Sequence, residues 1–435
     1  MPYEPVDVVE VRCWDARVGA LALDRASGFY AFEYAAGWVR RAVELAPIAM
    51  PITAADLPFV FPTLPVDTFH RLPAMIADSL PDEFGNALTT AYLTNEGVSA
   101  GDITPLDRLA YLGNRGVGAL EFRPTRGPRT RKATALELSE LVVAARSAVA
   151  AQIDTESGIT DAVKHLIAVG TSAGGARAKA VVALNPHTGD LRSGQVPADP
   201  GFEQWILKFD GVGTDADLGT TEHYGRIEYA YHLMAVAAGI EMTECRLLEE
   251  HGRAHFMSRR FDRDAHGAKI HMQTLCALSQ LDFRQIGAHD YAQLFQLVDQ
   301  LGLGPDTRAE VFRRMTFNVA AAICDDHTKN FSFLMPEGGP WRLSPAYDVT
   351  HAHAPDSQWT SQHLMAVNGR FTGIRRADVL DVADRFEVPD SLSIVTRVLD
   401  AVTRWATFAD QSGVPRAAAN HVAADITSWS APLQR

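Results

Sequence analysis

The sequence predicts an α+β fold, with short strands in its first half and helices in its second. Strands are indicated where hydrophobic residues alternate with polar ones and β-branched or aromatic residues are frequent. Helices are indicated beyond residue 280, where hydrophobic residues recur at helical spacing. The absence of an internal repeat disfavours a solenoid or a propeller. The 435 residues, 47% of them hydrophobic, are enough for about two to three domains.

The first 130 residues predict an N-terminal α+β subdomain (1–130). Three segments separated by the turn formers DARVG and DRASG predict a small antiparallel meander: 6–14, 19–23 and 29–34. The Pro-rich stretch 47–65 is expected to lack regular structure, whereas 82–92 and 104–112 predict helices. The basic, turn-rich segment PTRGPRTRK at 124–132 marks a boundary before the helical pattern of 136–150; its alternative interpretation is a solvated linker.

The next part, 131–262, predicts a nucleotide-binding lobe built from a sheet and one helix. Its strands are expected at 178–184, 205–209, 245–249 and 255–260. The helix at 227–238 is expected to end at Gly239, because glycine adopts the left-handed conformation of a helix end at little cost.

The remaining residues, 263–435, predict a mainly helical lobe. Helical periodicity is clear at 291–301, 307–323, 376–386 and 391–408. The strand-like segments FSFLM and WRL interrupt this pattern.

Composition limits the classes of function. A net charge of −13 argues against broad affinity for nucleic acid or anionic membranes, since both require a positive surface. The four cysteines are far apart and form no Cys-x-x-Cys pair, so the sequence predicts neither a zinc knuckle nor a disulfide framework. No basic leader and no apolar run of about 18 residues is present, so we expect a cytoplasmic protein.

The segment CDDHTKNFSF at 324–333 carries the clearest chemical signal. It lies between a long apolar helix and a strand, and Asp325 precedes Asn330 by five residues. Protein kinases use the spacing D-x-x-x-x-N for an aspartate that orients the acceptor hydroxyl and an asparagine that binds metal. The alternative is a solvated turn that caps the helix. His327 beside Asp325 does not predict a metal cluster, because adjacent residues cannot all face one ion, and a nucleotide contact or a structural role is expected instead.

A second acidic position follows in SPAYDVTHA, where Asp348 comes eighteen residues after Asn330. Magnesium prefers oxygen ligands and commonly takes one or two protein groups together with phosphates. Asn330 and Asp348 therefore predict a Mg²⁺ site. The alternative for Asp348 is the N-cap of a turn.

Upstream groups predict phosphate binding. The small-residue loop in GTSAGGARAKAVVAL at 170–184 has backbone N–H groups that can surround phosphate oxygens, although a flexible hairpin is its alternative. Lys208 in the strand QWILKF has the reach to bind phosphates; its alternative is a surface lysine. Glu228 is a candidate ion-pair partner for Lys208, with a solvated first-turn glutamate as the alternative.

The segment MSRRFDR at 257–263 is a candidate hinge whose backbone contacts adenine and whose Asp262 reaches ribose. A structural role is the alternative for Arg259 and Arg260.

Taken in order, seven blocks resemble the HipA family of bacterial serine/threonine kinases, the toxins of toxin–antitoxin modules. The blocks span nearly the whole chain: SLPDEFG with LDRLAYLGNRGVGALEFRP, then TSAGGARAK, WILKF, IEYAYHLMAVAAGI, RRFDR, DDHTKNFSF and SPAYDV. The resemblance implies an atypical two-lobed protein-kinase-like fold with an N-terminal β-rich subdomain and a large all-helical C-terminal lobe. It also implies ATP and Mg²⁺ as cofactors, Asp325 as the catalytic residue, and Asn330 and Asp348 as metal ligands.

Further roles follow from the resemblance alone. It assigns ATP contacts to Gly174, Gly175, Ala176, Arg177, Ala178, Lys179, Lys208, Arg259, Arg260, Phe261, Asp262, His327, Lys329, Asn330, Tyr347 and Asp348. Ser172 falls on the family's autophosphorylated serine, and a phosphate there would add about two negative charges and displace the loop, which inactivates the kinase. The sequence departs from some family members at Arg177, Ala178 and Arg259, which leaves nucleotide affinity open.

The resemblance implies partners as well. These are a small helix-turn-helix antitoxin of the HipB type, DNA only through that antitoxin, and a protein substrate such as glutamyl-tRNA synthetase or another translation factor. Two alternatives remain: a non-catalytic kinase-fold subunit of an antitoxin or repressor complex, and a small-molecule phosphotransferase.

Overall fold

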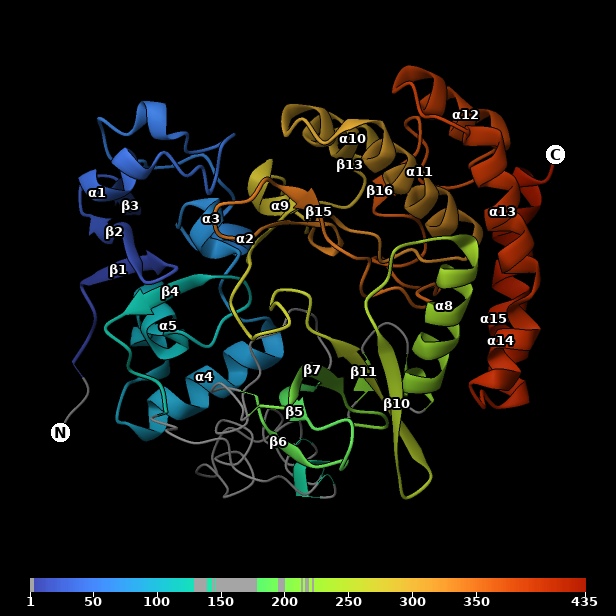
Figure 1. The fold of residues 1–435 in the computed structure, drawn as a ribbon, viewed down its shortest axis with the longest axis horizontal. Helices are drawn as coiled ribbons and strands as arrows, with labels where there is room; N and C mark the ends of the chain where they lie inside the picture. The colour runs from blue at the N-terminus through green and yellow to red at the C-terminus, as the bar shows by residue number, and fades with distance from the viewer. Residues whose placement is uncertain are drawn as a thin grey trace. The chain divides into compact units, whose positions relative to one another are not determined.

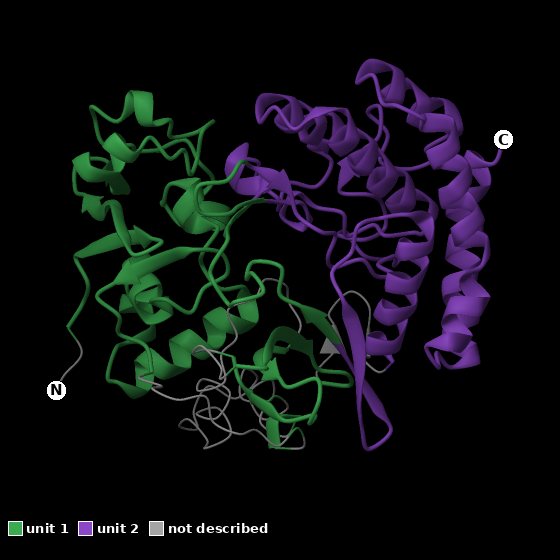
Figure 2. Ribbon diagram, in the orientation of Figure 1, with its two compact units in different colours: residues 1–213, 257–273, 334–340 green, residues 214–256, 274–333, 341–435 purple. Residues whose placement is uncertain are grey.

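A computed structural model describes residues 4–128, 178–194, 200–212 and 223–435, together with a few positions between 138 and 145 and the backbone of 214–215 and 219–220. Most of the helix predicted at 136–150, Ser172 and residues 174–177 lie outside the described residues. Two compact units share the chain (Figure 2): unit 1 is residues 1–213, 257–273 and 334–340, and unit 2 is residues 214–256, 274–333 and 341–435.

Unit 1 begins with the predicted antiparallel meander. Its strands are β1 (Val8–Cys13), β2 (Ala16–Asp24), β3 (Phe29–Tyr34) and the later β4 (Leu120–Arg123). They form one sheet in the order β3-β2-β1-β4 (Figure 1). Val9, Val11 and Cys13 of β1 are buried in the core. Gly19 of β2 lies so close to β3 that a Cβ there would meet the Glu33 carbonyl oxygen at 2.2 Å.

The helices of unit 1 connect β3 to β4. They are α1 (Ala36–Arg41), α2 (Val66–Phe69), α3 (Ala74–Ala77), α4 (Glu83–Asn95) and α5 (Pro105–Leu112), with 3₁₀ turns η1 (Ile52–Ala54) and η2 (Ala100–Asp102). The two predicted helices are therefore confirmed as α4 and α5. Asp82 caps α4 by accepting from the Gly85 N–H at 2.7 Å. Thr104 and Asp107 form a capping box at the start of α5.

A second sheet of unit 1 carries the predicted phosphate-binding strands. β5 (Lys179–Leu184), β6 (Leu191–Ser193) and β7 (Glu203–Lys208) pair in the order β7-β5-β6, with β11 (Arg253–Arg259) beside β7. Every residue of β5 is buried, which explains its nearly continuous apolar sequence. Lys179 and Lys208 are direct partners in the antiparallel β5–β7 register, so their side chains share one face of the sheet.

Unit 2 is mainly helical. Its helices are α8 (Tyr224–Ala238), α9 (Leu275–Leu278), α10 (Tyr291–Gln300), α11 (Gly304–Ala320), α12 (Arg376–Arg385), α13 (Ser391–Thr403), α14 (Trp405–Gln411) and α15 (Arg416–Ser430), with 3₁₀ turns η3 (Thr328–Asn330) and η4 (Ala431–Leu433). As predicted, α8 ends at Gly239, whose φ is +89°. Buried residues of α8, α11, α13, α14 and α15 form one hydrophobic core.

The remaining strands are short, and two of them, at 271–274 and 332–335, contain residues of both units. They are β8 (Thr214–Asp215), β9 (Gly219–Thr220), β10 (Cys245–Glu250), β12 (His271–Thr274), β13 (His289–Asp290), β14 (Ser332–Met335), β15 (Arg342–Leu343) and β16 (Met365–Ala366). The segments FSFLM and WRL are thus confirmed as strands. The C-terminal lobe is mainly rather than entirely helical.

One predicted helix is wrong in its extent. The segment 391–408 is two helices, α13 and α14, separated at Arg404. The break lets Trp405 pack against Tyr231 of α8 with 5.2 Å between the ring centroids. α15 was not predicted, since its apolar face is mostly alanine and only Val422, Ile426 and Ser430 are buried.

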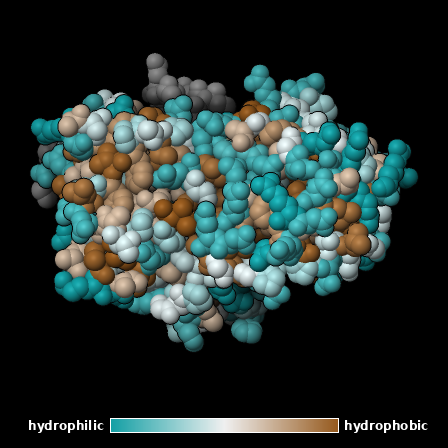
Figure 3. Space-filling view, turned by 90° about the horizontal axis from the view of Figure 1, so that it is seen from above, coloured by the Kyte–Doolittle hydropathy of each residue, from teal (hydrophilic) through white to brown (hydrophobic). Residues whose placement is uncertain are grey.

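The surface is mixed in character. On the face in Figure 3, hydrophilic residues alternate with smaller hydrophobic patches. Leu57 is the most exposed large hydrophobic residue among those described, at 74%. The four cysteines are buried. Within the described part of the chain, we find no helix with the length and apolar character needed to cross a bilayer.

Candidate active site

The segment that carries Asp325 follows the buried helix α11. After α11 ends at Ala320, the chain turns through Ala322, whose φ is +54°. The Cys324 N–H then donates to the Ala352 carbonyl at 3.2 Å, and Ile323 and Ala352 form a parallel bridge. Asp325 is thus presented from a loop that is held by the residues following Asp348.

The structure brings together the three residues predicted to carry the chemistry. Asp325, Asn330 and Asp348 line one pocket in unit 2. The Asn330 side-chain amide donates to the Asp325 carbonyl at 2.7 Å, and its backbone N–H donates to the His327 carbonyl at 2.9 Å. These bonds fold the five-residue interval into the tight turn η3. Asp326, Asn318 and Arg314 line the same pocket. The carboxylate and amide groups of Asp325, Asp348 and Asn330 are oxygen donors of the kind that Mg²⁺ prefers.

Tyr347 joins the two segments of the pocket. Its hydroxyl donates to the Lys329 carbonyl at 2.6 Å and contacts the Ser332 hydroxyl. The next residue, Asp348, has a φ of +52°, which is uncommon for a residue other than glycine. A backbone held in this conformation by its surroundings is typical of functional sites.

Asp325 lies in an aromatic and acidic environment. The Trp359 indole N–H donates to Asp325 Oδ1 at 2.6 Å, and His327 Nε2 lies 3.6 Å from the same oxygen. Burial raises the pKa of Asp325, and the nearby carboxylates of Asp348 and Asp326 add to this rise; His327 and the Trp359 N–H oppose it. Asp325 Oδ2 has no hydrogen-bond partner among the described residues, so it can receive a proton.

Asp326 has a different role from its neighbour. It is 1% exposed and accepts from the Tyr291 hydroxyl at 2.8 Å, from His363 Nδ1 at 2.9 Å and from the Leu364 N–H at 2.7 Å. A weaker bond comes from the Met365 N–H at 3.4 Å. Asp326 therefore anchors the Asp325 loop to α10 and to the segment before β16.

The predicted phosphate-binding lysines lie in unit 1. Lys179 is 1% exposed and its Nζ lies 2.9 Å from Asp82 Oδ2, at the N-terminus of α4. In this arrangement the Lys179 ammonium is directed at a carboxylate rather than at solvent. Lys208, its cross-strand partner, is only partly buried. Of the predicted loop, Ala178 is described and is 4% exposed.

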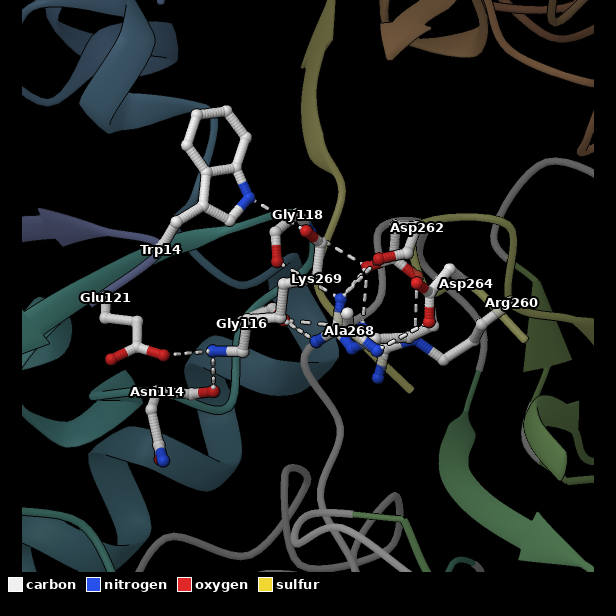
Figure 4. Close-up of polar contacts among 11 residues, drawn as sticks. Trp14, Asn114, Gly116, Gly118, Glu121, Arg260, Asp262, Asp264, Ala268 and Lys269 are labelled. Atoms are coloured by element: carbon white, nitrogen blue, oxygen red, sulfur yellow. Dashed lines mark hydrogen bonds and ion pairs between the residues drawn. The ribbon is translucent and has the colours of Figure 1, made fainter. Parts of the chain in front are cut away.

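The candidate hinge is an ion-pair cluster of unit 1 (Figure 4). Asp262 is 4% exposed; it accepts from Arg260 at 2.7 Å, from Arg263 at 2.8 Å and from the Gly118 N–H at 2.8 Å. Burial alone would raise the pKa of Asp262, but the two guanidinium groups hold it well below its usual range. These contacts support the structural alternative for Arg260 and argue against a ribose contact by Asp262.

The remaining hinge positions are less enclosed. Arg259 lies 3.2 Å from Glu203, and Phe261 is partly buried.

Glu228 was predicted either to pair with Lys208 or to be a solvated residue of the first helical turn. The second alternative is wrong, because the Glu228 side chain is 2% exposed in α8.

Several residues of the site were not found from the sequence. Trp359 contacts Asp325, and His363 and Tyr291 contact Asp326. Phe283 packs near His327 at 5.3 Å and under the Lys329 ammonium at 4.6 Å. Asp326 belongs to the same motif, but only Asp325 stands at the D-x-x-x-x-N spacing, so no role was predicted for Asp326. No local pattern marks the others.

Comparisons with known proteins agree with this organisation. The HipA N-terminal domain matches residues 9–123, and the HipA-like C-terminal domain matches residues 171–430. The division into 1–130, 131–262 and 263–435 stays a prediction, because the compact units follow contacts rather than chain order.

Two curated proteins of Sinorhizobium fredii are similar to parts of the chain. "Putative kinase Y4mE" is 29% identical over 140 residues, and "Putative kinase Y4dM" is 28% identical over 177 residues. These matches cover 30% and 35% of this chain. They span only 32% and 39% of the relatives' own lengths.

A solved structure is similar over nearly the whole chain. It is the toxin–antitoxin system of Shewanella oneidensis MR-1, a complex of HipA, HipB and operator DNA. It matches with a TM-score of 0.65 and 17% identity, covering 98% of this chain and 96% of that one, which confirms the α+β, HipA-like fold. Since the C-terminal domain alone matches more than half of its residues, the chain belongs to the HipA family.

Proposed function

We propose that this protein is an ATP- and Mg²⁺-dependent protein serine/threonine kinase and the toxin of a toxin–antitoxin module. One observation carries the proposal: Asp325, Asn330 and Asp348, from separate positions in the sequence, line a single pocket. Membership of the HipA family supports it, as do the kinase names of the two curated relatives.

The pocket gives each residue a role. Asn330 and Asp348 would hold Mg²⁺, which when bound neutralises charge on the phosphates. Asp325 would accept a hydrogen bond from the substrate hydroxyl and take its proton as the new oxygen–phosphorus bond forms and the bond from the γ-phosphorus to ADP breaks. The Trp359 N–H fixes Oδ1 of Asp325, so the proton goes to Oδ2.

ATP binding is assigned to Lys208 and to the loop that ends at Lys179. Lys208 is the stronger candidate for a phosphate contact, because the Lys179 ammonium already faces Asp82. Ser172 remains the predicted autophosphorylation site; mass spectrometry after incubation with Mg-ATP tests it.

The partner is proposed to be a HipB-type antitoxin, because the similar Shewanella structure is a complex with HipB and operator DNA. DNA would then be reached through the antitoxin. A chain with a net charge of −13 is consistent with this indirect contact. The substrate is proposed to be a serine or threonine of a translation protein, glutamyl-tRNA synthetase included.

Radiolabelled ATP tests the activity on a cell lysate. Asp325→Asn is expected to lower labelling by about 10²–10⁴-fold, the usual contribution of a general base. Asp348→Asn is expected to raise the Mg²⁺ concentration that gives half-maximal labelling. Asp356→Asn, at an exposed aspartate eight residues further on, is the matched control and should label like the wild type.

The two alternatives predict other outcomes. Equal labelling by wild type and Asp325→Asn, together with retained antitoxin binding, would indicate a non-catalytic binding subunit. Label that depends on Asp325 but appears only in small molecules would indicate a small-molecule phosphotransferase.

A further inference from the structure

Three histidines and an aspartate of unit 2 lie together: His351 and His353 shortly after Asp348, and His421 and Asp425 on α15. His351 Nε2 lies 2.8 Å from Asp425 Oδ2, and His353 Nδ1 lies 3.1 Å from Asp425 Oδ1. His421 packs edge-to-face against His351 with 5.8 Å between ring centroids. Ligand atoms of His351, His421 and Asp425 all lie within 4.8 Å of one another.

The secondary structure presents these groups as a site. His421 and Asp425 are four residues apart on α15, so they lie on the same face, one turn from each other. Val422 and Ile426 are buried in the core of unit 2 and fix the rotation of the helix. His421 is exposed and gives access from solvent, whereas His351 is buried.

The hydrogen bonds of this cluster involve two of its three histidines. His351 and His353 approach different oxygens of the Asp425 carboxylate, which has acceptor sites for both. His353 Nδ1 is paired with Asp425 Oδ1 at 3.1 Å, whereas His421 makes a ring contact with His351 and no hydrogen bond among the described residues. A cation bound by His351, His421 and Asp425 would give a ring nitrogen of His421 a partner.

We propose that His351, His421 and Asp425 form a binding site for a divalent transition metal of the zinc type, with water completing its coordination. Imidazole and carboxylate are the ligands of Zn²⁺, Co²⁺ and Ni²⁺, whereas Mg²⁺ prefers oxygen alone. Tetrahedral ligands with bonds of about 2.0–2.1 Å lie about 3.3 Å apart, so His351 Nε2 and Asp425 Oδ2, which are 2.8 Å apart, need to separate only slightly to bind one ion. When Nε2 of His351 binds the ion, its imidazole carries the hydrogen on Nδ1.

The site is separate from the candidate active site but connected to it. Ala352, between His351 and His353, accepts from the Cys324 N–H and donates to the Ala322 carbonyl at 3.4 Å. Cys324 precedes the catalytic Asp325. A bound ion would therefore join α15 to the segment that supports the catalytic loop.

Metal binding by the full-length, untagged protein tests the proposal. Equilibrium dialysis against Zn²⁺ is expected to give one tightly bound ion per chain, and Co²⁺ is expected to give the visible absorption of tetrahedral coordination. His421→Ala and Asp425→Asn should each weaken Zn²⁺ binding by at least about tenfold, since even ligand-orienting residues contribute about 10–100-fold. His421 is exposed, so its substitution should leave the fold intact, which circular dichroism checks.

Two controls identify the site. His266→Ala removes an exposed histidine on a turn of unit 1, and Asp348→Asn removes a predicted Mg²⁺ ligand; both should bind Zn²⁺ like the wild type. The proposal is overturned if the wild type shows no saturable Zn²⁺ binding, or if folded His421→Ala and Asp425→Asn bind it unchanged.

Discussion

Replacing Asp326 by alanine should destabilise unit 2 far more than the same change at Asp325. Asp326 is buried, and its loss leaves the Tyr291 hydroxyl, the His363 imidazole and two backbone N–H groups without their acceptor. Removing one partner from a buried network of this kind costs about 3–5 kcal/mol. Asp325 loses only the Trp359 bond and is 40% exposed, so its replacement should cost little.

Thermal unfolding followed by circular dichroism measures the difference. For a unit of roughly 200 residues, a loss of about 3–5 kcal/mol lowers Tm by roughly 6–20 °C. Asp326→Asn should lose less, because the amide oxygen still accepts from the Leu364 N–H. The exposed Asp356→Ala is the control and should match the wild type. A Tm for Asp326→Ala within about 2 °C of wild type, or an equal loss for Asp325→Ala, would refute the reasoning.

Three further predictions follow from the contacts. The folded state raises the pKa of Asp325, so keeping this carboxylate ionised costs stability at neutral pH. Asp325→Asn should therefore have the higher Tm at about pH 7, and the difference in Tm should narrow as pH falls toward about 3.9, the pKa of an unperturbed aspartate. A gap that is constant with pH would contradict this. Lys179→Met should destabilise unit 1 by about 3–5 kcal/mol in urea unfolding, because it leaves a buried carboxylate, and adding Asp82→Asn should restore most of the loss. If the double variant instead lost the sum of the stabilities lost by the two single variants, the ion pair between Lys179 and Asp82 would be refuted. Gly225→Ala should lower Tm, since its Cβ would lie 1.9 Å from a backbone carbonyl oxygen, at a cost of about 1–3 kcal/mol; Gly37→Ala, which meets nothing closer than 3.9 Å, is the control.

Elements with strong periodicity were predictable to within a few residues. The segments 227–238 and 291–301 correspond to α8 and α10 because each carries enough apolar residues to define a buried face. α15 escaped prediction because alanine contributes little to such a pattern. The break between α13 and α14 at Arg404 was not predicted, because it depends on the packing of Trp405 against Tyr231 and not on the helix propensity of the residues around it.

The spacing from Asp325 to Asn330 determined the turn of the candidate active site, since the Asn330 side-chain amide donates to the Asp325 carbonyl five residues earlier. Other contacts have no local signal. Trp359 reaches Asp325 across 34 residues, and His363 reaches Asp326 across 37. For Asp262 the local sequence suggested a ligand contact that the structure does not support. Its carboxylate is buried between Arg260 and Arg263.

The sequence alone determined the order of strands and helices, the family resemblance and the residues around Asp325, because these depend on periodicity and on interactions between near neighbours. Only the tertiary structure decided that Asp326, and not Asp325, accepts from Tyr291 and His363, that Lys179 faces Asp82, and that His351 meets Asp425. Such contacts join residues distant in sequence, and their free energy depends on burial and on the partner that packing provides.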